Sequence, residues 1–351
     1  MGLTGRLRPH AVRKPSTRAQ TSGPIHRNPS VSGQIGAHGA SWATSSLSRV
    51  ARAGASLTIV LVTDASTEAS AHAGARLGGV SERAETGTWH YGLVARWWAE
   101  FNTPEHEEVD YLRAAIERFG QPALDLGCGT GRIMLPLLEA GLDVDGADIS
   151  ADMVAHARAT AERAGYSPTL VAQPMHELDL ARRYRTIFSI GTFGIGGNRE
   201  NEREGLARAY RHLEPTGALL INHELPYREL SEEQWALWLP GRRKDVLPRA
   251  WDNSGSRKRT ANGDEIELIV RTAELDPLAQ RLTYDMRARL WRDGAIVEEE
   301  TSRLHNSLYF AQEIVLLLRE AGFESVEIES GYTGRAATPD DGIVMFVARK
   351  A

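Results

Sequence analysis

The sequence is poor in the residues that form covalent cross-links and metal cages. Cys128 is the single cysteine in 351 residues. This excludes a disulfide framework and a multi-cysteine zinc site, so we predict no metal site. A lone thiol suits a reducing compartment, and we expect a cytoplasmic protein. No run of 18 or more apolar residues occurs, so we expect no transmembrane helix and no membrane partner.

Negative charge is also scarce at one end of the chain. Residues 1–79 carry nine basic and two acidic residues, whereas the remainder carries 32 basic and 44 acidic residues. A nucleic-acid-binding surface needs a basic face, and the body of this chain is acidic. We therefore do not expect a nucleic-acid partner.

The N-terminal segment lacks helical and strand periodicity. It is rich in Ser, Gly, Ala, Thr and Arg, and it buries too little apolar surface to offset the entropy of ordering. We predict a disordered or over-long N-terminal tail over residues 1–85, in which Ala55–Val62 is long enough for one strand. A transit peptide and an extension with its own role stay open as alternatives.

From Thr88 onward, helical and strand patterns alternate. Helices are expected over 89–101, with Thr88 as N-cap, and over 105–119, with Pro104 as the first helical residue. The following succession of strands and helices predicts an α/β fold with a parallel doubly wound sheet. The expected strands are Ala123–Leu126, Asp143–Ala147, Thr169–Ala172, Thr186–Ile190 and Ala218–Asn222, and the expected helices are Arg132–Ala140, Ala151–Ala164 and Glu200–Leu213.

Residues 225–307 interrupt this alternation. Three strand-like runs are separated by turn dipeptides of the Asp-Pro and Asp-Gly type. In the second run, apolar residues recur at every other position, as in a half-buried strand. We expect an inserted antiparallel sheet. The expected elements are helix Glu232–Leu239, a polar loop Pro240–Gly263, strands Glu265–Leu275, Arg281–Arg292 and Ala295–Ser307, and then helix Ala311–Ala321 and strands Val326–Glu329 and Ile343–Ala348.

The segment between the first two strands of the alternation carries the most specific chemistry. Gly127, Gly129 and Gly131 let the backbone approach a ligand, and free amides at the start of the next helix attract an anion or carboxylate. Asp148 ends the next strand, where a carboxylate can accept both hydroxyls of a ribose. A dinucleotide fingerprint would need glycine at Arg132, so a nicotinamide oxidoreductase is disfavoured.

The string D-L-G-C-G-T-G from Asp125 to Gly131, followed by Asp148, resembles motif I of class I S-adenosylmethionine (SAM) dependent methyltransferases. The resemblance covers about residues 88–224 and 310–349. It implies a Rossmann-like seven-stranded sheet with a reversed last hairpin, and SAM as cofactor. We therefore expect a SAM-binding domain over 86–224 and 308–351.

The insert at 225–307 resembles the antiparallel β cap of small-molecule methyltransferases, including sugar and amine N-methyltransferases. In those families the cap covers the acceptor, and a homodimer formed through it stays open here. The basic loop from Arg242 to Arg259 could hold a phosphorylated acceptor, or it is simply solvated.

The resemblance also assigns cofactor contacts to particular residues. We expect methionine contacts from Asp125, Gly127 and Gly129, a ribose contact from Asp148, adenine contacts from Ile149, Met153, Gln173 and Met175, a sulfonium contact from Gly191, and a lid contact from Tyr91. Two positions depart from the family pattern. Pro174 stands where an acid is expected near the adenine, and Arg185 stands at the acid position that opens the fourth strand.

The acceptor is expected beyond the ends of the fourth and fifth strands, and His223 and Glu224 follow the fifth. A general base is needed if the accepting atom arrives protonated. Strand alternation lets only one of the two face the pocket, unless the strand has ended. We choose His223 as the catalytic residue, with Glu224 as the alternative.

The sequence thus predicts methyl transfer from SAM to a nitrogen or oxygen atom of a small molecule. A methyltransferase acting on protein or RNA stays open, although the chain lacks an N-P-P-Y tetrapeptide and a zinc-ligand set. A SAM-binding regulatory pseudo-enzyme also stays open, because of Pro174 and Arg185.

Overall fold

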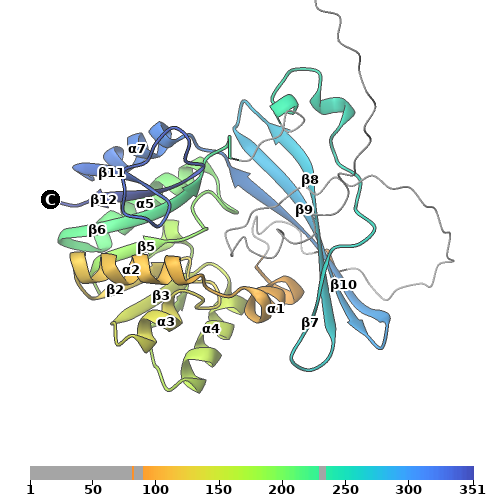
Figure 1. Cartoon of the computed structure of the whole chain (residues 1–351), viewed down its shortest axis with the longest axis horizontal. Coiled ribbons are helices and arrows are strands. Elements are labelled where there is room, and N and C mark those ends of the chain that lie inside the picture. Colours follow the sequence, from red (N-terminus) through yellow and green to blue (C-terminus); the bar gives the residue numbers. More distant parts are fainter. Residues whose placement is uncertain (1–80, 83–89, 229–234) are drawn as a thin grey trace, which may run out of the picture. The chain divides into compact units, whose positions relative to one another are not determined.

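The computed structural model describes residues 81–82, 90–228 and 235–351. These residues form a seven-stranded sheet with helices and a second, five-stranded sheet (Figure 1). The predicted cap Thr88, the candidate strand Ala55–Val62 and the start of the predicted helix Glu232–Leu239 lie outside the described residues.

The seven-stranded sheet has the order β11-β12-β6-β5-β2-β3-β4. Its strands are β2 (Ala123–Leu126), β3 (Val144–Asp148), β4 (Leu170–Ala172), β5 (Tyr184–Ser189), β6 (Leu213–Glu224), β11 (Ser325–Ser330) and β12 (Ile343–Arg349). Strand β12 runs antiparallel to both β6 and β11, whereas β2 to β6 pair in parallel. The Rossmann-like sheet with a reversed last hairpin is therefore confirmed.

The helices begin where side chains satisfy the first free amides. Ser150 Oγ accepts a hydrogen bond from the amide of Met153 and caps α4. Helix α2 begins with a capping box between Glu105 and Glu108, so Pro104 precedes the cap and is not the first helical residue. The helices are α1 (Gly92–Phe101), α2 (His106–Phe119), α3 (Met134–Glu139), α4 (Ala151–Arg163), α5 (Arg199–His212) and α7 (Ala311–Glu320), with short 3₁₀ turns η1 (Met175–Glu177) and η2 (Arg243–Asp245).

Helices pack on both faces of this sheet. Apolar residues of α2, α3 and α4, among them Ile116 and Leu137, share one buried cluster with one face of the strands. Residues of α5 and α7, among them Leu206 and Leu318, share another with the opposite face. Because both faces are covered, the central strands are rich in buried apolar residues, such as Ile187 and Phe188 of β5.

The second sheet has the order β1-β10-β9-β8-β7 and confirms the inserted antiparallel cap. Its strands are β1 (Ser81–Glu82), β7 (Ser256–Arg259), β8 (Glu265–Asp276), β9 (Arg281–Arg292) and β10 (Ala295–Ser307). Two features differ from the sequence expectation. Strand β7 lies inside the predicted polar loop, and β1 pairs with Glu300 and Thr301 although it belongs to the predicted tail.

Two segments join the cap to the cofactor side of the fold. Met286 and Leu290 of β9 share a buried cluster with Leu93 and other residues of α1. In addition, the amide of Ser307 at the end of β10 donates to the carbonyl of Gly194, 2.8 Å away, in the loop after β5. The cap is thus anchored beside the C-terminal ends of the parallel strands, where ligands bind in sheets of this kind.

Candidate active site

The glycine loop after β2 is shaped by backbone conformations that other residues rarely adopt. Gly127 has a φ of 89° and Gly129 a φ of 53°. A Cβ atom at Gly127 would lie 2.6 Å from the side chain of Thr192, so only glycine fits there. The amide of Gly129 donates to Asp148 Oδ2 across 2.8 Å, and the Ser150 amide donates to Oδ1 at the same distance.

Two carboxyl groups are buried around this loop. Burial raises the pKa of Asp125 to about 8; the charge of Arg132 lowers it, and that of Asp148 raises it further. Burial also raises the pKa of Asp148, whereas the hydrogen bonds from the amides of Ser150 and Gly129 lower it. Buried acids beside open space are poised to be ionised by a cationic or hydrogen-bonding ligand.

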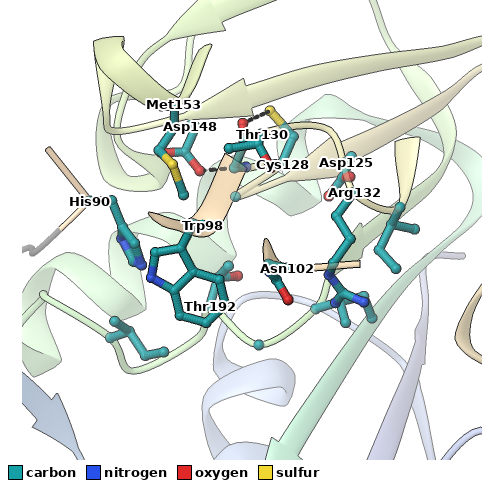
Figure 2. A pocket seen from close by; sticks show the side chains of 16 residues that line it. His90, Trp98, Asn102, Asp125, Cys128, Thr130, Arg132, Asp148, Met153 and Thr192 are labelled. Atoms are coloured by element: carbon teal, nitrogen blue, oxygen red, sulfur yellow. Dashed lines mark hydrogen bonds between the residues drawn. The ribbon is translucent and has the colours of Figure 1, made fainter. Parts of the chain in front are cut away.

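A first cavity, the loop pocket, encloses about 680 Å³ over the glycine loop. Asp148 and Met153 lie toward one end beside His90, and Asp125 and Arg132 lie toward the other (Figure 2). Trp98 of α1 lines the pocket as well.

The predicted lid contact, Tyr91, lies at the start of α1. Tyr91 does not line the loop pocket; it is the N-cap residue of α1, and its hydroxyl donates to the carbonyl of Ile149 at 3.4 Å. The helix begins at Gly92 and not at residue 89, so Tyr91 has an extended backbone and is not part of the helix. Trp98 and Asn102 face the pocket instead.

A second cavity, the side pocket, encloses about 880 Å³ and shares Asp148 and Gly127 with the loop pocket. It brings together three of the predicted adenine contacts, namely Ile149, Gln173 and Met175. The fourth, Met153, lines the loop pocket and not this one.

A third cavity, the cap pocket, encloses about 650 Å³ and shares Gly191, Thr192 and Ile195 with the loop pocket. It lies between the ends of β5 and β6 and the cap strands. Its further lining residues are Phe193, Asn222, His223, Glu224, Tyr284, Leu304 and Asn306. His223 and Glu224 both line it.

The surroundings of His223 do not favour it as a base. Its Nε2 lies 3.1 Å from the carbonyl oxygen of Tyr309, so that nitrogen carries the hydrogen and donates it. Burial lowers the pKa of His223 to about 4, with the Tyr309 carbonyl acting in the opposite direction. A ring that resists protonation this strongly is a weak proton acceptor at neutral pH.

Glu224 is placed more favourably. Its side chain keeps 33% of its surface exposed, and Oε1 accepts from Arg228 Nη1 at 2.8 Å. Burial raises the pKa of Tyr284, and the charge of Glu224 raises it further, which places this carboxylate near the phenol across the pocket. The geometry therefore favours Glu224 over our first choice, His223.

Several lining residues carried no signal in the sequence analysis. His90 and Asn102 flank α1, and Asn222 stands just before the two candidate bases. Only Asn222 could have been found, since it ends the predicted strand Ala218–Asn222, whose next two residues were singled out.

Within the described ranges, no cluster of three or more His, Cys, Asp or Glu is arranged to hold a metal ion. None of the helices described there combines the length and apolar character needed to cross a bilayer.

Comparisons with known proteins converge on this region. A family model described as a methyltransferase domain matches residues 123–217. A putative methyltransferase from Geobacillus sp. (strain WCH70) is 24% identical over 268 residues, which is 74% of this chain and 99% of that protein. The glycine/sarcosine N-methyltransferase of Halorhodospira halochloris is 31% identical over 137 residues, 37% of this chain and 51% of that protein.

A solved structure shares the fold. The CcbJ methyltransferase from Streptomyces caelestis matches with a TM-score of 0.56 and 22% identity, over 76% of this chain and 99% of that one. The family model begins at β2 and ends within β6, and so spans the glycine loop and Asp148. The chain is an enzyme of the class I SAM-dependent methyltransferases, and SAM is its cofactor.

Proposed function

We propose that the chain transfers the methyl group of SAM to an amine nitrogen of a small molecule held in the cap pocket. One observation carries this proposal. The cap pocket meets the loop pocket at Gly191 and Thr192, and Glu224 is the one acidic residue among the described residues that line it. A carboxylate at that place attracts a cationic amine.

The residues of the loop pocket fit the cofactor. A Cβ at Gly127 would collide with the side chain of Thr192, so this position of the pocket lining requires glycine, and Asp148 can accept the ribose hydroxyls. We assign Asp125 and Gly129 to the methionine part, with Asp125 nearest the amino group. The side pocket, with Ile149, Gln173 and Met175, is assigned to the adenine. In this assignment residues 86–224 and 308–351 bind the cofactor, and 225–307 cover the acceptor.

SAM supplies a methyl group on a positively charged sulfur, so the leaving group is already activated. The chain contributes alignment and exclusion of water. Glu224 holds the amine and takes the proton that an ammonium must lose before its lone pair can attack. Gly191 and Thr192 line both pockets, so the amine meets the methyl carbon beside them.

Nitrogen is favoured over oxygen by two arguments. A carboxylate recognises a cationic amine better than a neutral hydroxyl. The relative from Halorhodospira halochloris is named for N-methylation, although the match covers half of that protein. A macromolecular acceptor is less favoured, because the carboxylate lies in a pocket between the sheet end and the cap and not on an open face.

The proposal is tested by following the label from [methyl-¹³C]SAM into four acceptor panels: small amines, small hydroxyl compounds, total RNA and unfolded proteins. We expect transfer to the amine panel, lost in the Glu224→Gln variant. Label only in RNA, in protein or on oxygen would contradict the proposal. SAM binding by calorimetry with no transfer to any panel would favour the regulatory alternative. The same panels incubated with labelled SAM but without the protein serve as the control for non-enzymatic methylation.

A further inference from the structure

A chain of hydrogen bonds runs through the interior from the loop after β5 to the glycine-loop side of the cofactor site. The amide of Gly191 donates to Asn222 Oδ1 across 2.5 Å. Asn222 Nδ2 donates to the hydroxyl of Tyr332 at 2.8 Å, and that hydroxyl donates to Glu108 Oε1 at 3.0 Å. Arg132 closes the chain, since both of its terminal nitrogens donate to the Glu108 carboxylate.

The two ends of this chain touch the pockets, and its middle is shielded from water. Gly191 lines both the loop pocket and the cap pocket, and Arg132 lines the loop pocket. Glu108 and Asn222 are only 1% and 3% exposed. Five separate segments contribute one residue each, so this chain of hydrogen bonds forms only in the folded protein.

The donor and acceptor roles along this chain of hydrogen bonds can be assigned in one way only. A backbone amide and a guanidinium always donate, and a carboxylate paired with a guanidinium accepts. Tyr332 must therefore donate to Glu108 and keep its oxygen as acceptor for Asn222 Nδ2. Burial and the adjacent Glu108 raise the pKa of Tyr332, so the phenol keeps its hydrogen. Flipping the Asn222 amide would set its NH₂ group against the Gly191 amide and leave two buried groups unpaired.

We propose that Tyr332 is a positioning residue: its hydroxyl fixes the orientation of the Asn222 amide, and the amide fixes the Gly191 peptide between methyl donor and acceptor. Tyr332 itself is not among the residues that line the three pockets, so it acts through the residues that it contacts, of which Asn222 leads to Gly191. The proposal rests on SAM binding in the loop pocket and not on the identity of the acceptor. The positioning role of Tyr332 can therefore be disproved while the proposed function stands, and the proposed function can be disproved while the positioning role stands.

Tyr111 offers a matched control for the substitution Tyr332→Phe. Its hydroxyl also donates to a carboxylate, Glu329 Oε2, at 2.7 Å. The two rings meet edge to face with centroids 5.9 Å apart, so both lie in the same environment. Tyr111→Phe removes a comparable hydrogen bond that does not lead to Asn222.

The first measurement is amide hydrogen exchange in cofactor-free protein labelled with [¹⁵N]glycine. We expect Tyr332→Phe to speed exchange at Gly191 by about tenfold, the order expected for one weakened hydrogen bond, and Tyr111→Phe to leave it unchanged. Equal exchange in wild type and Tyr332→Phe, or an equal acceleration in both variants, would overturn the proposal.

The second measurement is the NMR methyl resonance of [methyl-¹³C]SAM bound at saturation. We expect it to shift in Tyr332→Phe and in Asn222→Ala, to shift no further in the double variant, and to stay at the wild-type position in Tyr111→Phe. The SAM Kd should change by less than about threefold in Tyr332→Phe, because no cofactor contact is removed. A wild-type methyl resonance in folded Tyr332→Phe, or additive shifts in the double variant, would overturn the proposal. Should Tyr332→Phe fail to fold, the comparison of Asn222→Ala with Tyr111→Phe tests the proposal, with the same expected and contradicting results for Gly191 exchange and the bound methyl resonance.

Discussion

The amide of Gly129 and the carboxylate of Asp148 are joined by a hydrogen bond of 2.8 Å, which ties the glycine loop to the end of β3. The Ser150 amide takes a second acceptor position on the same carboxylate. An ionised carboxylate offers roughly four lone-pair positions. About two therefore remain for a ligand, which is the number that the two hydroxyls of a ribose require.

We predict that Asp148→Ala weakens SAM binding at least about tenfold, because charge-assisted hydrogen bonds of this kind are worth about 1.5–3 kcal/mol. Calorimetry with SAM measures the effect. Asp143→Ala is the matched control, since Asp143 pairs with Arg182 at the surface and lines none of the three pockets. An unchanged Kd in folded Asp148→Ala would remove the ribose assignment.

The buried Asp125 predicts a pH dependence of cofactor binding. Burial raises its pKa to about 8, so the empty pocket holds the protonated acid at pH 7. A cationic amino group favours the carboxylate, so binding releases a proton, and affinity rises as the pH increases toward 8. Calorimetry in two buffers of different ionisation enthalpy counts that proton.

The amino group of SAM also titrates, so the comparison must be made with Asp125→Asn. This variant binds the same ligand but has no acid to ionise, and it should release fewer protons at pH 7. Identical proton release in the two proteins would show that Asp125 does not face the amino group.

The two residues at the end of β6 should behave differently. We predict that Glu224→Gln lowers kcat by roughly 10²–10⁴, the range for loss of a proton-transfer group, whereas His223→Asn lowers it by less than about threefold. Because the pKa of His223 is lowered to about 4, His223 should cause no inflection of the pH–rate profile near pH 6.5. The profile of His223→Asn in that range should therefore match that of the wild type. Turnover is measured at saturating SAM with the amine found by labelling. The opposite ranking of the variants would restore His223 as the base.

Locally encoded parts of the fold were predictable from the sequence. Strands β9 and β10 have the expected boundaries, because their hairpin turns and alternation lie within the strands themselves. Strand β7 was missed, because all four of its side chains are exposed and it shows no alternation; it forms by backbone pairing at the sheet edge. Its charged residues are typical of a protected edge strand.

The candidate site likewise has parts that a local motif predicts and parts that depend on contacts between distant residues. The glycine loop and Asp148 follow from a contiguous motif, so their pairing could be anticipated. The lining by Trp98 and Asn102 could not be anticipated in this way, because the sequence indicated a start of α1 at residue 89, whereas the helix begins at Gly92. The chain through Asn222 and Tyr332 joins residues 110 positions apart, and no sequence period reports such a contact.

The loop that anchors the cap should be sensitive to a single methyl group. Gly194 has a φ of 90°, and a Cβ there would lie 2.9 Å from the carbonyl oxygen of Ser307. Gly165 has a similar φ of 83° but nothing within 4 Å. Alanine at either position carries the left-handed backbone cost, and only Gly194→Ala also pushes against the end of β10.

We therefore expect Gly194→Ala to lower the Tm by roughly 2–4 °C more than Gly165→Ala, the shift that about 1 kcal/mol produces in a domain of this size. Differential scanning calorimetry of the two variants gives the comparison. Equal losses would mean that the cap tolerates displacement at this anchor.

The most direct test of the account is a crystal structure of the full chain with S-adenosylhomocysteine. The account predicts the ribose hydroxyls on Asp148, the adenine in the side pocket, and the sulfur beside Gly191, facing the cap pocket and Glu224. A sulfur atom facing away from the cap pocket, or a ribose without contact to Asp148, would contradict it.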